Sequence, residues 1–289
     1  AGDEQSHKVD EPLRYAPARD HELSLTHSSS YTRPSYRDLL GYTSVASAAF
    51  LRKGNSGLRT AYRRGLSLNY TYMRAAQLEL SYTDTEDPIV EAIPPMYGGG
   101  ITLRRYNLDY SRTLRALLVL PLPLVSQKKF SWLALTILAA QRQWDAGHIE
   151  MTDYSAALNT QFVQHRHSFS LPSDWTVDLG VTYYSGVLYE LYRIQRQWWV
   201  DASVSKRMGN LRATLSARDP FNTNIARGSY NLDVPPLAFE RNWHSPRLEL
   251  TISYSWGKKS VKAQDTRARY DDLKRLTTGA SEGMNTPAQ

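Results

Sequence analysis

Two histidines separated by one residue are the first side chains in this sequence whose types and spacing could do chemistry. On a β-strand, His165 and His167 would point to the same face, as two ligands of one metal ion do. A protein metal site needs further ligands, and none stands at a suitable spacing from this pair. The sequence therefore predicts no metal centre. It favours ordinary polar positions for both histidines, on a water-filled interior surface or at a strand end.

Seven charged residues on alternating segments are the second group that could do chemistry. Paired carboxylates can act as general acid and base. Arginines share the same faces, however, and a wall that faces water carries charges of both signs without catalysis. We therefore expect no catalytic residue and no enzyme activity. The seven candidates for facing an aqueous interior are Glu79, Asp178, Asp201, Arg212, Arg218, Arg247 and Glu249.

Neither a phosphate-binding loop nor a nucleic-acid site is expected. The glycine run at residues 98–100 lacks the following helix and lysine of a phosphate cradle, so a loop is expected there. The net charge is +7 and the isoelectric point about 9.4. Part of that excess lies after residue 257, in a mixed-charge tail without interleaved aromatic residues. The sequence predicts no nucleic-acid partner and no cofactor.

Composition restricts the fold class. The chain contains no cysteine, so neither disulfides nor thiolate metal sites contribute. The mean hydropathy is −0.51, and no uncharged apolar run reaches the roughly 20 residues of a membrane-spanning helix. The nearest candidate, residues 116–140, is interrupted by two prolines and two lysines and predicts a hairpin.

Alternation with period two is the main pattern in the chain. Residues 247–257 place Leu248, Leu250, Ile252, Tyr254 and Trp256 on one face and only polar side chains on the other. Similar segments recur at residues 22–28, 65–72, 77–83, 106–111, 130–144, 154–170, 175–183, 198–205 and 211–218. The pattern predicts roughly ten strands, long enough to cross a bilayer when tilted.

Connections between these segments alternate between short and long. Short turns are expected near Arg74, Ser173 and Gly209, and long loops near Asn55, Gly99 and Asn231. Outer-membrane barrels alternate in this way, with short periplasmic turns and long external loops. The sequence thus predicts an all-β fold: an antiparallel transmembrane β-barrel or part of one. A soluble β-sandwich remains the alternative, since it alternates similarly along each strand.

Three regions and several details follow from this interpretation. Residues 1–20 form a polar lead-in, residues 21–257 the barrel strands and residues 258–289 a polar periplasmic tail. Tyr72, Trp175 and Trp256 are expected in an aromatic girdle at the periplasmic interface. In residues 154–170 the apolar parity slips between Phe162 and Phe169, which predicts a β-bulge.

Several stretches give the chain a family resemblance. Tyr-Thr-Arg-Pro-Ser-Tyr at residues 31–36, Phe-Ser-Leu-Pro at 169–172, Ala-Arg-Asp-Pro-Phe-Asn-Thr-Asn at 217–224 and Ser-Tyr-Ser-Trp-Gly-Lys-Lys at 253–259 occur in order, together with Gly54-Asn55 and the segment 78–90. The chain resembles the outer-membrane β-barrel domain of TonB-dependent-receptor-like proteins from about residue 12 to the tail. Trp256 departs from the family's more usual phenylalanine.

The resemblance implies the C-terminal part of such a barrel in a Gram-negative outer membrane. Receptors of this kind have about 22 strands and a plug, whereas neither that number of strands nor a plug-like segment is found here. The resemblance implies binding or uptake of a nutrient, with lipid, the energy-coupling TonB system and an extracellular lipoprotein as candidate partners. TonB coupling acts through a plug, so a self-closing small barrel acting as a passive pore or surface-binding protein is the alternative.

Overall fold

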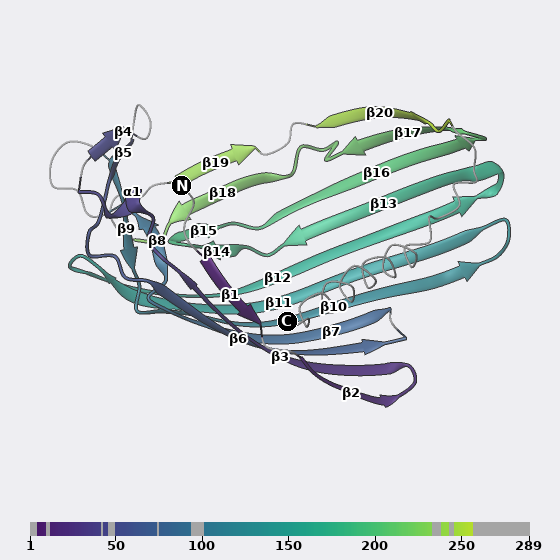
Figure 1. The fold of residues 1–289 in the computed structure, drawn as a ribbon. Helices are drawn as coiled ribbons and strands as arrows, with labels where there is room; N and C mark the ends of the chain where they lie inside the picture. Colours follow the sequence, from purple (N-terminus) through teal and green to yellow (C-terminus); the bar gives the residue numbers. More distant parts are fainter. Residues whose placement is uncertain are drawn as a thin grey trace, which may run out of the picture.

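The computed structural model describes residues 5–9, 12–41, 43–45, 50–73, 75–93, 101–232, 238–242 and 246–256. Their main feature is a 12-stranded antiparallel sheet, strongly curved into a trough (Figure 1). Its strands are β1 (Gln5–Val9), β2 (Leu13–Ala18), β3 (His21–Thr32), β6 (Ala61–Tyr72), β7 (Ala76–Glu86), β10 (Tyr110–Ser126), β11 (Ser131–Ile149), β12 (Thr152–Leu171), β13 (Trp175–Tyr184), β16 (Gln197–Met208), β17 (Leu211–Arg218) and β20 (Arg247–Tyr254).

The sheet has two free edges in the described part of the chain. Strands β1 and β2 both pair with β3 at one edge, and β20 pairs only with β17 at the other. The sheet begins earlier than predicted, because β1 and β2 lie within the lead-in of residues 1–20. The tail at residues 258–289 and the glycine run at residues 98–100 lie outside the described residues.

Short turns gather at one end of the trough, which we call the short-turn end. They include residues 73–75, 127–130 and 209–210 and the 3-10 turn η1 (Pro172–Asp174). Longer connections leave the opposite, long-loop end at residues 33–60, 87–109, 185–196 and 219–246. This confirms the predicted alternation and the predicted hairpin within residues 116–140. The hairpin of β11 and β12 also turns at the long-loop end, through residues 150–151.

The long connections contain structure that alternation did not predict. One four-stranded sheet consists of β4 (Thr43–Val45), β5 (Phe50–Lys53), β9 (Ile101–Asn107) and β8 (Ile89–Ala92), beside the short helix α1 (Tyr36–Leu39). A second consists of β14 (Val187–Tyr189), β15 (Tyr192–Ile194), β18 (Ile225–Tyr230) and β19 (Ala238–Asn242). The predicted strand through residues 106–111 is therefore split between β9 and β10.

Residues of the long connections pack together into a small hydrophobic core at the long-loop end. Ile93, Leu108, Ile149 and Leu191 are fully buried there. Other members include Val90, Ala92, Tyr106, Tyr154, Tyr230 and Leu232. Most of these side chains come from connections far apart in sequence, and Ile149 and Tyr154 come from the ends of β11 and β12. Their packing therefore fixes the loops to one another and to the end of the sheet.

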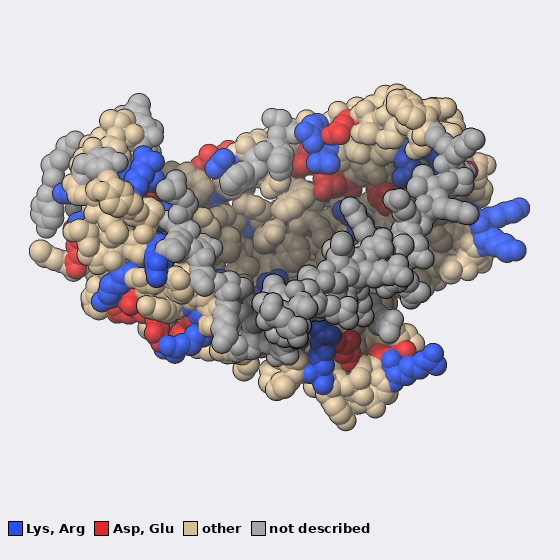
Figure 2. Space-filling view, in the orientation of Figure 1, with Lys and Arg blue, Asp and Glu red and all other residues tan. Residues whose placement is uncertain are grey.

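Register assigns each side chain of the main sheet to one of two faces. Leu179 of β13 lies level with Ala202 of β16, and Ala202 lies level with Ala217 of β17, all on one face. The neighbouring positions Asp178, Ser203 and Ser216 share the opposite face. The polar face lines the hollow that is visible in Figure 2. The apolar face is exposed on the outside of the trough. The described residues include no helix with the length and apolarity needed to cross a membrane.

The predicted bulge in residues 154–170 is wrong. β11 and β12 pair without a break from Ser131–Ser170 to Ile149–Thr152. The apolar parity slips because Phe162 and Phe169 lie on opposite faces of a regular strand. Phe162 packs on Tyr184 on the polar face, with ring centroids 4.7 Å apart, whereas Phe169 stacks on Trp132 on the apolar face at 5.5 Å.

Candidate functional site

Five residues form one row across the polar face, perpendicular to the strands. Arg166 of β12 is level with Gly180, Gly180 with Asp201, Asp201 with Arg218, and Arg218 with Arg247. The row therefore contains three guanidinium groups and one carboxylate. Gly180 leaves space within it, and the Nε atom of Arg166 lies 3.9 Å from where a Cβ of residue 180 would be.

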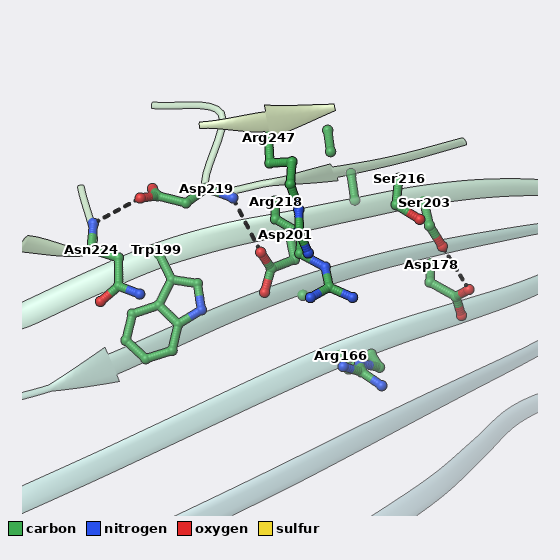
Figure 3. A pocket seen from close by; sticks show the side chains of 13 residues that line it. Arg166, Asp178, Trp199, Asp201, Ser203, Ser216, Arg218, Asp219, Asn224 and Arg247 are labelled. Atoms are coloured by element: carbon green, nitrogen blue, oxygen red, sulfur yellow. Dashed lines mark hydrogen bonds between the residues drawn. The ribbon is translucent and has the colours of Figure 1, made fainter. Parts of the chain in front are cut away.

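This row lines a pocket on the polar face with a volume of about 670 Å³, which we call the larger pocket. Figure 3 shows the arginines of the row extending into the pocket, with Trp199 at one side and Asp178 at the other. Trp199 stacks on Tyr184 at 6.0 Å, and Tyr184 in turn packs on Phe162. The pocket thus combines charged groups with an aromatic wall on the side of the long-loop end.

The carboxylates of the pocket have hydrogen-bond partners, whereas two of its three arginine side chains have none among the described residues. The Asp201 carboxylate accepts the backbone N–H of Asp219 at 3.2 Å, and the Asp178 carboxylate accepts the Ser203 hydroxyl at 3.1 Å. Arg247 pairs with Glu249 at 3.2 Å. Within the described residues, the guanidinium groups of Arg166 and Arg218 have neither a hydrogen bond nor an ion pair.

Asp219 borders the pocket but keeps its charge away from the arginines. Its carboxylate accepts the N–H and hydroxyl of Thr223 at 2.8 and 3.0 Å and the N–H of Asn224 at 3.0 Å. In Figure 3 this carboxylate points toward Asn224. Its role is to hold the turn that follows β17, because three hydrogen bonds satisfy a side chain that is only 2% exposed.

A second pocket of about 370 Å³ lies further along the same face. Arg63, Glu79, Arg115 and Gln141 line it with several hydroxyl-bearing residues. A Cβ at position 65 would lie 2.7 Å from the Ser28 hydroxyl, so a larger residue there would require the Ser28 side chain to rotate.

All seven predicted interior residues lie on the polar face. Asp178, Asp201, Arg218 and Arg247 come together at the larger pocket, and Glu79 lies in the smaller one. Glu249 neighbours the larger pocket through its pair with Arg247. Arg212 shares the face but lies closer to the short-turn end, level with Ser253. Sequence patterning missed Arg166 and Trp199. Arg166 lies in the segment whose apolar parity slips, and Trp199 is an aromatic residue on the polar face of an alternating strand.

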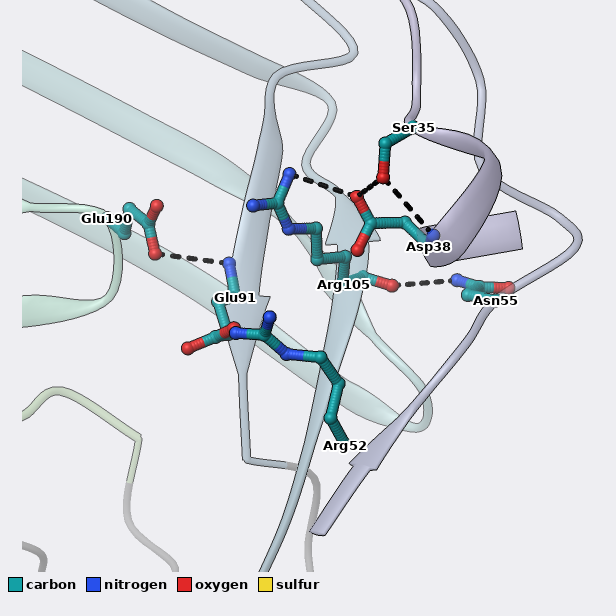
Figure 4. Close-up of polar contacts among 7 residues, drawn as sticks. All are labelled: Ser35, Asp38, Arg52, Asn55, Glu91, Arg105 and Glu190. Atoms are coloured by element: carbon teal, nitrogen blue, oxygen red, sulfur yellow. Dashed lines mark hydrogen bonds and ion pairs between the residues drawn. The ribbon is translucent and has the colours of Figure 1, made fainter. Parts of the chain in front are cut away.

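Ion pairs and hydrogen bonds connect the long loops around their core (Figure 4). Arg52 pairs with Glu91, and Arg105 pairs with Asp38 at 3.2 Å. The Glu190 carboxylate accepts the backbone N–H of Glu91 at 3.2 Å. Burial is the main factor that raises the pKa of Glu190, and the nearby Glu91 carboxylate adds to it.

Comparison with protein families decides what this sheet is. The model of the outer membrane protein β-barrel family matches residues 12–254. The chain belongs to this family. Its convex apolar face is therefore the lipid-facing surface of an outer-membrane barrel, and its polar face lines the lumen. Comparisons with curated proteins and with solved structures gave no match.

Membrane-interface residues of the barrel lie at both ends of the apolar face. Trp132 and Trp144 are 12 positions apart on the lipid-facing side of β11. At about 3.3 Å per residue and a tilt of about 40°, they are separated by roughly 30 Å along the membrane normal, close to the bilayer's hydrocarbon thickness. Of the three residues predicted for a periplasmic girdle, Tyr72 and Trp175 lie at the short-turn end, and Trp256 follows β20 with 86% exposure.

Arginine–aromatic pairs mark the opposite interface of the barrel. Arg112 lies over the Tyr110 ring at 4.4 Å, and Arg142 over the Trp144 ring at 5.2 Å. In each pair the arginine and the aromatic residue are two positions apart on one strand, and Arg112 is level with Trp144 on the neighbouring strand. Sequence patterning missed this belt, although an arginine two positions from an aromatic residue on one strand face is a recognisable signal.

The two histidines lie on the lipid-facing side, so the expected polar interior position is wrong. His167 is level with Leu179, and His165 with Val181. Trp132 Nε1 donates to His167 Nδ1 at 2.9 Å, the two Nε2 atoms are 2.9 Å apart, and His165 Nδ1 lies 2.8 Å from the Thr136 hydroxyl. This series of hydrogen bonds satisfies all four ring nitrogens without water when both rings are neutral. No group of three or more potential metal ligands occurs among the described residues.

Proposed function

We propose that this chain is the barrel segment of a TonB-dependent-receptor-like protein that takes part in binding and uptake of a nutrient across the outer membrane. The observation that carries the proposal is the position of the charged lumen pocket below a packed long-loop end. A barrel that only lets solutes diffuse needs a polar wall, but it does not need loops fixed by a common core.

The proposal includes the surroundings of the barrel. The long loops lie outside the cell, and the tail after residue 257 lies in the periplasm. Energy comes from the inner membrane through the TonB system and a plug, and an extracellular lipoprotein is a candidate partner. The proposal assigns no catalytic role to the barrel, and it is supported by Asp178, Asp201 and Glu249, whose carboxylates are engaged with a hydroxyl, a backbone N–H and an arginine.

A passive pore is the second candidate function, favoured by the polar lumen face that runs the length of the described sheet. One experiment separates the two candidates. Strains with and without the gene are grown in the same complex medium, and depletion of medium solutes is followed by mass spectrometry.

The receptor proposal predicts that at least one solute disappears more slowly from the deletion strain. Depletion by the wild type should saturate with concentration and stop when an uncoupler collapses the inner-membrane gradient. Depletion that depends on the gene but ignores the uncoupler would establish the passive pore instead. Identical depletion by both strains would overturn both candidate functions.

A further inference from the structure

The cross-strand row of the larger pocket contains two like charges placed opposite each other. Arg218 and Arg247 are register partners on β17 and β20, and both side chains point into the lumen. Like charges directly opposite on neighbouring strands destabilise a sheet. Glu249 compensates only Arg247, at 3.2 Å, which leaves the charge of Arg218 unpaired in the described residues.

On the other side of Asp201, the one carboxylate of the row, Arg166 is a second guanidinium without a salt bridge among the described residues. The Asp201 carboxylate already accepts the backbone N–H of Asp219, and Asp178 accepts the hydroxyl of Ser203. Two guanidinium groups thus face one pocket with all their donors available. Arginine presents donors in a planar fork that matches the two oxygens of a carboxylate or phosphate group.

The aromatic wall indicates which chemical group of a ligand would lie beside its anionic group. Trp199 lines the same pocket and stacks on Tyr184, whose ring also contacts Phe162 on the lumen face. Such rings expose apolar surface to a water-filled lumen, and a flat ligand ring can cover part of that surface. Arg166 and Arg218 lie one row further toward the short-turn end than Trp199.

We infer that this pocket binds a small solute in which a carboxylate or phosphate group is attached to a flat ring. The oxyanion lies between Arg166 and Arg218, above the gap left by Gly180, and the ring lies against Trp199. This inference rests on the proposed function and names the chemical class of the solute.

Binding to the purified full-length protein in detergent micelles tests the inference by isothermal titration calorimetry. The probes are benzoate, its neutral analogue benzyl alcohol, and inorganic phosphate. We expect benzoate and phosphate to bind and benzyl alcohol to bind at least tenfold more weakly, because it cannot form charge-assisted bonds. Equal binding of benzoate and benzyl alcohol would overturn the inference.

Substitutions assign the roles within the pocket. Arg166→Gln and Arg218→Gln should each weaken benzoate and phosphate binding about tenfold, since each removes one charge-assisted contact. Trp199→Leu should weaken benzoate and leave phosphate unchanged. Arg115→Gln, at the smaller pocket of the same face, is the matched control and should bind all probes as the wild type does.

A melting experiment separates a lost site from a misfolded variant. Phosphate should raise the Tm of the wild type and of Arg115→Gln but not that of Arg218→Gln. Without phosphate, Arg218→Gln should melt at the same or a higher temperature, because the repulsion with Arg247 is removed. Unchanged affinity in both arginine variants would refute the inference even if uptake in cells is confirmed. Binding without gene-dependent uptake would refute the proposed function and leave the site standing.

Discussion

Glu190 connects the chemistry of one carboxyl group to the packing of the outer loops. It lies in the turn between β14 and β15, next to the fully buried Leu191, and accepts the N–H of Glu91. Burial and the charge of Glu91 raise its pKa above the ordinary glutamate value. The protonated form is therefore favoured by the folded loops more than by the unfolded chain.

The sign of the resulting pH dependence follows from linkage. With its folded-state pKa raised, Glu190 contributes stability that is fully present below the unfolded pKa and is lost as pH rises through the folded value. Glu190→Gln removes the charge and keeps an acceptor for Glu91. We expect this variant to melt at a higher temperature than the wild type at neutral pH.

Thermal melts of the loops, followed by near-UV circular dichroism between about pH 4 and 8, measure this effect. The difference between Glu190→Gln and the wild type should shrink toward zero as pH falls. Glu86→Gln, an exposed residue at the end of β7, is the control and should show only a small change. A Glu190→Gln variant that is less stable at neutral pH would contradict this account of the carboxyl group.

Docking of one loop on the sheet depends on a single glycine. The connection between β8 and β10 crosses β11 at Gly147, where Asp109 donates its N–H to the carbonyl of Ala146 at 2.8 Å. A Cβ on Gly147 would lie 2.6 Å from the backbone of Leu108, which is closer than real Cβ contacts occur. The backbone there cannot move without displacing Leu108 from the loop core.

Gly147→Ala should therefore destabilise the long-loop end, by about 1–3 kcal/mol as for other overpacked sites. Limited proteolysis of the loops measures this loss of stability, and cleavage within residues 87–109 should become faster. Gly180→Ala is the matched control on the same sheet, because its Cβ would meet only ordinary contacts near 3.9 Å. Equal cleavage rates in both variants would show that the loop does not depend on this contact.

Regular strands of the main sheet were predictable from sequence, and the loop strands were not. Segments such as Trp175–Tyr184 alternate because one face meets lipid and the other water. Strand β8 is only four residues long, and apolar residues stand on both sides of Glu91, so its sequence shows no alternation although Val90 and Ala92 share the buried face. The row from Arg166 to Arg247 was not predictable either, because it requires the register of five neighbouring strands. That register depends on the length of every turn between β12 and β20.

Curvature and face chemistry together define the molecule as a whole. Twelve strands form one open trough, with lipid-facing leucines and tyrosines outside and a charged lumen inside. The outward histidines are consistent with this arrangement only because Trp132 and Thr136 satisfy their ring nitrogens. The pocket faces water only if the polar face of this sheet lines the lumen.

Single-cysteine labelling along β13 tests that assignment most directly. The chain has no natural cysteine, so each substitution introduces the only thiol. Protein with cysteine at position 177, 178, 179, 180 or 181, embedded in lipid vesicles, is treated with a charged maleimide that does not enter lipid. The account predicts labelling at positions 178 and 180 and protection at positions 177, 179 and 181. Uniform labelling, or protection of positions 178 and 180 instead, would contradict it.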